Sequence, residues 1–71
     1  MRTLQVLDKK GIPIRELAEI AILDIFKDKN IEERLERLKD KGVSERILAI
    51  LLLEKYEEKE IEKLVCEYRL N

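Results

Sequence analysis

Residues 14–26 read IRELAEIAILDIF, and this stretch decides the fold class. Its apolar side chains recur every three to four residues, which is the spacing of one face of an α-helix. They are Ile14, Leu17, Ala18, Ala21, Ile22 and Ile25. Pro13 precedes them, at a position where a first helical residue needs no backbone N–H donor. We therefore predict a helix over residues 13–28.

Capping residues divide the rest of the chain into further helices. Asn30 is a good N-cap, Gly42 is the residue type expected just after a helix end, and Ser44 can cap the next helix. We predict these helices over residues 31–41, 44–55 and 57–69. No Gly or Pro separates the last two. We favour a turn near Lys55-Tyr56-Glu57, because acidic residues after it would sit in a first helical turn; one continuous helix stays open.

The first twelve residues are undecided. Thr3 to Leu7 alternates weakly between polar and apolar side chains, which fits a short strand or an irregular arm, and Asp8 to Gly11 is a turn signal. With 71 residues the chain makes one domain, 1–71. We predict an all-α fold: a small three- or four-helix bundle, orthogonal or up-down, with an N-terminal arm (1–12) of uncertain structure.

The apolar faces of these helices define a predicted core. The run from Ile47 to Leu53 holds seven consecutive apolar residues, and these cannot all face one neighbour on a helix. We expect the following side chains to be buried together: Leu17, Ala21, Ile25, Leu35, Leu38, Ile47, Leu51, Ile61, Leu64 and Val65.

The composition lacks the parts of most catalytic and ligand sites. The chain is 44% charged and 45% hydrophobic, with no His, no Trp, one Cys and a net charge of -1. Without His there is no Ser-His or Cys-His pair, and zinc sites need several Cys or His ligands. Cys66 fits a small, partly buried side chain better than a reactive thiol. We therefore expect no enzyme activity, catalytic residue, cofactor, metal or small-molecule substrate.

The same composition bears on source and location. Glu, Lys, Arg and Ile are plentiful while Gln, Asn, Ser and Thr are rare, which is typical of hyperthermophile proteins. No stretch of 18 apolar residues exists, so we expect no membrane span. We expect a soluble, cytoplasmic protein.

The segment from Leu38 to Ser44 resembles the turn of helix-turn-helix proteins, with an apolar residue four places before Gly42. The resemblance implies a nucleic-acid-binding regulator, which is our alternative function. The residues facing a DNA groove would then be Glu45, Arg46, Ala49 and Ile50. These residue types read bases poorly and the chain has no basic surplus, so we do not favour nucleic acid as a partner.

Three other patterns resemble parts of known families. The Leu38-x-x-x-Gly42-Val43 spacing is similar to the first loop of ubiquitin-associated domains, with Val43 in place of the usual aromatic residue. Residues 53–64 are similar to the entry into the DNA-binding region of sigma factors. An N-terminal strand before helices resembles ribbon-helix-helix dimers, which implies base reading by Arg2, Thr3 and Gln5.

Our leading interpretation is a small non-catalytic helical protein with an interaction or structural role. Two predicted helices are apolar almost all round in a chain too short to surround both. The side chains that point away from the main stripes form the predicted partner surface: Ile20, Leu23, Leu52 and Leu53. The partner is an unidentified protein or a second copy of the chain, and a homodimer and a monomer both stay open.

Overall fold

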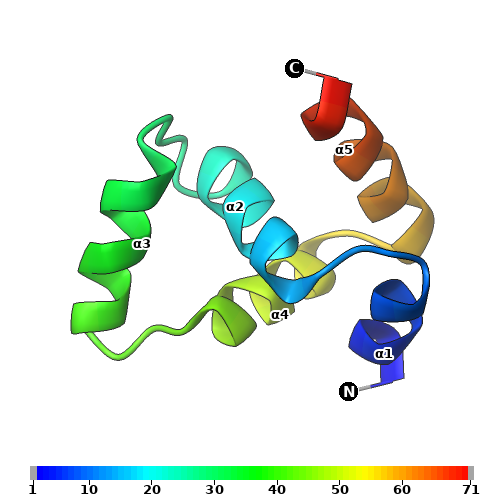
Figure 1. The fold of residues 1–71 in the computed structure, drawn as a ribbon, viewed down its shortest axis with the longest axis horizontal. Coiled ribbons are helices and arrows are strands. Elements are labelled where there is room, and N and C mark those ends of the chain that lie inside the picture. Colours follow the sequence, from blue (N-terminus) through cyan, green and yellow to red (C-terminus); the bar gives the residue numbers. More distant parts are fainter. Residues whose placement is uncertain (1, 71) are drawn as a thin grey trace.

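The computed structural model describes residues 2–70, with side chains from residue 4 onward, and this part of the chain is all-helical without strands. Its helices are α1 (Arg2–Lys9), α2 (Ile14–Asp24), α3 (Ile31–Asp40), α4 (Glu45–Lys55) and α5 (Glu58–Leu70). Figure 1 shows α2 between α3 and α5, with α4 crossing beneath it. The all-α prediction is confirmed, and the predicted count of three or four helices is met in part: the four predicted helices are present, and the N-terminal arm, whose structure the sequence leaves open, forms a further helix among the described residues.

The extra helix, α1, forms because its apolar residues fit a helix better than a strand. Leu4 and Leu7 lie three residues apart, so a helix turns both toward the core, where both are buried. Gly11 ends the segment with a φ of +82°, and Ile12 is buried just beyond it. Since residues 2–9 are helical, the strand that the ribbon-helix-helix resemblance requires is absent from this segment.

Helix α2 forms the centre of the fold. It packs most extensively against α4 and also contacts α3 and α5. It begins after Pro13, as predicted, but ends at Asp24 instead of near residue 28. The chain leaves the helix there because Lys27 adopts a left-handed conformation with a φ of +54°, and the backbone N–H of Asp28 donates to the Ile22 carbonyl at 3.3 Å.

The turn between α3 and α4 follows its sequence signals. Gly42 has a φ of +88°, and the Val43 N–H donates to the Leu38 carbonyl at 2.8 Å, which satisfies a carbonyl of the last turn of α3. The Ser44 hydroxyl accepts a hydrogen bond from the Ile47 N–H at 3.3 Å, as a cap should. Asn30 occupies the N-cap position of α3 without such a bond, and its side chain donates to Glu33 instead.

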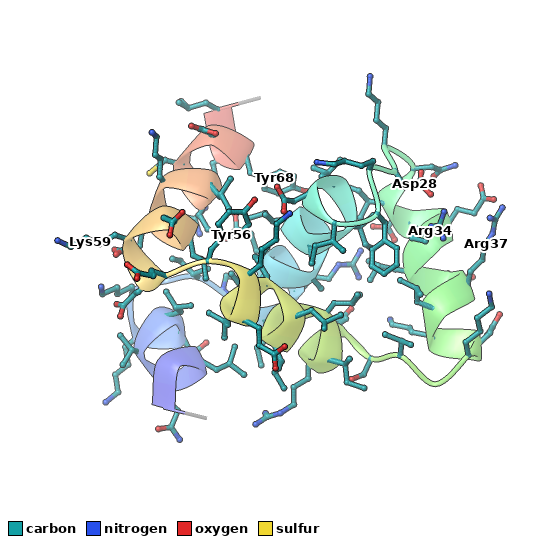
Figure 2. All side chains as sticks on the ribbon, turned by 180° about the vertical axis from the view of Figure 1, so that it is seen from behind. Asp28, Arg34, Arg37, Tyr56, Lys59 and Tyr68 are labelled. Carbon is teal, nitrogen blue, oxygen red and sulfur yellow. The ribbon has the colours of Figure 1, made fainter. Side chains whose placement is uncertain are left out.

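Helices α4 and α5 are separate, because Tyr56 is in an extended conformation between them. Two hydrogen bonds hold this break against the end of α2. The Tyr56 hydroxyl donates to an Asp24 carboxylate oxygen at 2.8 Å, and the Lys55 ammonium donates to the same carboxylate at 2.8 Å. Figure 2 shows Tyr56 and Tyr68 turned toward α2.

The core contains most, but not all, of the predicted side chains. Buried as predicted are Leu17, Ala21, Leu35, Leu38, Ile61 and Val65, while Ile25 and Leu64 are half-buried. The prediction of burial is wrong for Ile47 and Leu51, which are 43% and 38% exposed. Helix α4 instead buries Leu48, Ala49 and Leu52 against the core. An apolar run that covers every side of a helix does not specify which side faces inward.

No helix within residues 2–70 combines the length and the apolar character needed to cross a bilayer.

Candidate interaction surface

Helix α4 carries apolar side chains on the side that faces away from the core. Ile47 and Leu51 lie four residues apart, so they stack one turn above the other on the same face. We call these two residues the α4 outer face. Beside them, Ile50 on α4 and Val43 in the preceding turn are half-buried and pack against the core. Among the side chains that the structure describes, Leu70 at the end of α5 is also large, apolar and exposed.

Charged residues of opposite sign lie at the two ends of the α4 outer face. Arg46 is at the N-terminal end and Glu54 at the C-terminal end, and both are exposed. Neither forms an ion pair with another residue between positions 4 and 70. Arg46 borders a hollow of about 250 Å³ that Asp8 also lines, without a salt bridge between them. The face is therefore apolar in its middle and oppositely charged at its ends.

Charged side chains on other helix faces form ion pairs between helices. The Arg15 guanidinium pairs with Glu19 on its own helix, with Glu32 of α3 and with Glu45 of α4. Arg69 of α5 donates to Glu16 of α2 and to the Gly11 carbonyl. These bonds tie α2 to its neighbours and leave the α4 outer face outside the network.

The predicted partner surface is not assembled by the fold. Ile20 and Leu52 are 4% and 0% exposed, so they belong to the core and cannot present a surface. Ile20 is covered because α5 folds back over α2, and α4 turns Leu52 inward. Leu23 and Leu53 are half-buried. Leu23 lines a hollow of about 230 Å³ between α2 and α5, together with Leu64 and Tyr68.

Polar groups between α2 and the α4–α5 segment are paired with one another. The Tyr68 hydroxyl donates to Glu19, and this hydrogen bond together with burial raises the pKa of Tyr68 to about 12. Burial raises the pKa of Asp24, but the hydrogen bonds from Lys55 and Tyr56 outweigh it, so the pKa is lowered overall. Both sets of hydrogen bonds connect α2 to the segment formed by α4 and α5 and so stabilise the fold.

The possible metal ligands in the described part of the chain are one cysteine and the acidic residues. Cys66 is exposed, where the sequence predicts partial burial. No cluster of three or more His, Cys, Asp or Glu side chains among the described residues is arranged to hold a metal ion.

The geometry of α3, the turn and α4 also bears on the helix-turn-helix alternative. Of the residues predicted to face a groove, Ala49 is buried, and Glu45 is half-buried and paired with Arg15 and Lys39. Arg46 is exposed and Ile50 is half-buried, and the exposed side of α4 also presents the apolar side chains Ile47 and Leu51.

No protein-family model, curated protein sequence or solved structure matches this chain.

One signal in the sequence does identify the α4 outer face. The stripe through Ile47 and Ile50 continues onto Glu54, whereas the stripe through Leu48 and Leu52 continues onto the half-buried Tyr56. A stripe that ends in a charge faces solvent, and a stripe that ends in an aromatic residue faces the core.

Proposed function

We propose that this protein is a small, non-catalytic helical protein with an interaction or structural role, and that it binds a protein partner through the α4 outer face. One observation carries the proposal: Ile47 and Leu51 are 43% and 38% exposed on one face, although fifteen other apolar side chains among the described residues are buried. Apolar surface that a small domain leaves in one patch marks an interaction site.

The surface predicts the chemistry of the partner. Covering the exposed parts of Ile47 and Leu51 is worth about 1 kcal/mol each, so the partner presents an apolar helix or groove. The charges at the two ends favour an acidic group opposite Arg46 and a basic group opposite Glu54. The paired charges on the other faces are typical of a hyperthermophilic source. We expect the protein to be cytoplasmic.

Site-specific photocrosslinking tests the proposal. A photoreactive amino acid placed at Ile47 in the full chain should give a discrete protein adduct in source-cell extract. Adding Leu51→Glu to the same chain should abolish the adduct, because it puts a charge in the apolar face. The control position is Glu36, which is exposed on α3, and it should give none. Absence of any discrete adduct from Ile47, or equal adducts from Glu36, would contradict the proposal.

The alternative function is a nucleic-acid-binding regulator of helix-turn-helix type. The four-residue connection between α3 and α4, with Gly42 in its left-handed conformation, is the observation that favours it. Binding to bulk DNA distinguishes the two functions, because a phosphate-binding protein is retained at low salt and released as salt rises. We expect no salt-dependent retention.

A further inference from the structure

We propose that the partner of the α4 outer face is a second copy of this chain, bound so that the two α4 helices run antiparallel across a two-fold axis. The inference rests on the proposed function, because it names the partner of that same surface. It follows from the arrangement of apolar and charged residues along α4.

The apolar centre of the face is self-complementary. Ile47 and Leu51 lie symmetrically about the level of Ala49 on α4. A two-fold axis at that level places Ile47 of one copy opposite Leu51 of the other, and does so twice, as an isologous interface requires. The two most exposed apolar side chains of the helix then cover each other.

The charged ends set the direction of the second copy. Arg46 and Glu54 are eight residues apart, about 12 Å along the helix axis. With the axis at Ala49, Arg46 of one copy comes within about 3 Å of the level of Glu54 of the other. Helical side chains lean toward the N-terminus, which in an antiparallel pair brings these two toward each other. A parallel copy would place like charges together instead.

Two ion pairs between Arg46 and Glu54 therefore flank the two apolar contacts. Within one copy, neither of these residues has an ion-pair partner between residues 4 and 70. The antiparallel arrangement also aligns the two α4 macrodipoles favourably. The interface is small. An eleven-residue helix covers less than the roughly 800 Å² per partner of a standard interface, so the dimer is weak and reversible.

A charge-exchange experiment tests this pairing by sedimentation equilibrium between about 10 µM and 1 mM, the range of a weak dimer. The wild-type chain should self-associate. Arg46→Glu and Glu54→Arg should each weaken self-association about tenfold, because each turns two attractive pairs into repulsive ones. An equimolar mixture of the two variants should form a heterodimer, since one face is then acidic at both ends and the other basic. The double variant should associate like the wild type.

Matched controls are Glu36→Lys on α3 and Lys59→Glu on α5, which reverse exposed charges away from α4 and should leave association unchanged. Lys59 points away from the body of the protein in Figure 2. Circular dichroism of every variant checks that the fold is retained.

Three results would overturn the inference. They are no wild-type association up to about 1 mM, association that neither charge reversal weakens, and single variants that do not recover on mixing. Each of these leaves the proposed function standing if the photocrosslink from Ile47 joins a different protein. Failure of both the crosslink and the association overturns both.

Discussion

At the scale of single residues, the two neighbours Leu51 and Leu52 separate surface from core. Leu52→Ala should lower the free energy of unfolding by about 2–5 kcal/mol, because Leu52 is 0% exposed and its loss leaves a cavity. Leu51→Ala, the matched control with identical chemistry, should cost less than about 1 kcal/mol in dilute solution. Urea unfolding measures both. Equal losses would mean that the orientation of α4 is wrong.

The stability of the fold depends on pH in the alkaline range because of Tyr68. Its hydrogen bond to Glu19 exists only in the folded state and favours the protonated phenol, so its folded-state pKa is about 12, above the ordinary 10.0. The stabilisation is fully present below pH 10.0 and is lost as the pH rises toward about 12. Tyr68→Phe should therefore destabilise the protein at neutral pH, and its deficit should shrink across this range.

Ultraviolet titration checks the cause of this effect. The difference between the wild-type and Tyr68→Phe titration curves isolates the Tyr68 phenol. Glu19→Gln removes the carboxylate that holds the proton, so this difference curve should move down toward the ordinary pKa of 10.0. A difference curve that Glu19→Gln leaves unmoved would contradict the role of this hydrogen bond.

At the scale of elements, Gly42 sets the path from α3 to α4. A Cβ at this position meets nothing within 4 Å, so the cost of a side chain is the left-handed backbone alone. Gly42→Ala should destabilise the protein by about 1–2 kcal/mol, and Gly42→Asn by less, because Asn tolerates this conformation better. Urea unfolding of the three proteins measures the order. An Ala variant as stable as the wild type would show that the turn does not need a left-handed residue.

The elements themselves were predictable where local chemistry decides them. Pro13, Gly42 and Ser44 act through their own backbone and side-chain preferences, and the helices begin or end beside them. The end of α2 was not predictable, because Ile25 and Phe26 are as suitable for a helix as the residues before them. The inward side of α4 was not decided by periodicity either, since it depends on where α2 lies.

At the scale of the whole molecule, long-range packing determines what the sequence left open. Leu4 and Leu7 have a core to enter only because α1 folds against the other helices. The burial of Ile20 also depends on long-range packing, because α5, the helix that covers it, begins only at Glu58. The excess of apolar side chains predicts exposed apolar residues, and the packing of the helices exposes Ile47 and Leu51 instead of Ile20 and Leu52.

In the proposed dimer, the α4 outer faces of two copies of the chain contact each other. The most direct test is an isotope-filtered nuclear Overhauser measurement on an equal mixture of ¹³C-labelled and unlabelled protein at about 1 mM, where a weak dimer is populated. We expect intermolecular cross-peaks between the methyl groups of Ile47 and Leu51. A protein that shows no intermolecular cross-peaks, or shows them only from Leu23 and Leu53, would contradict it.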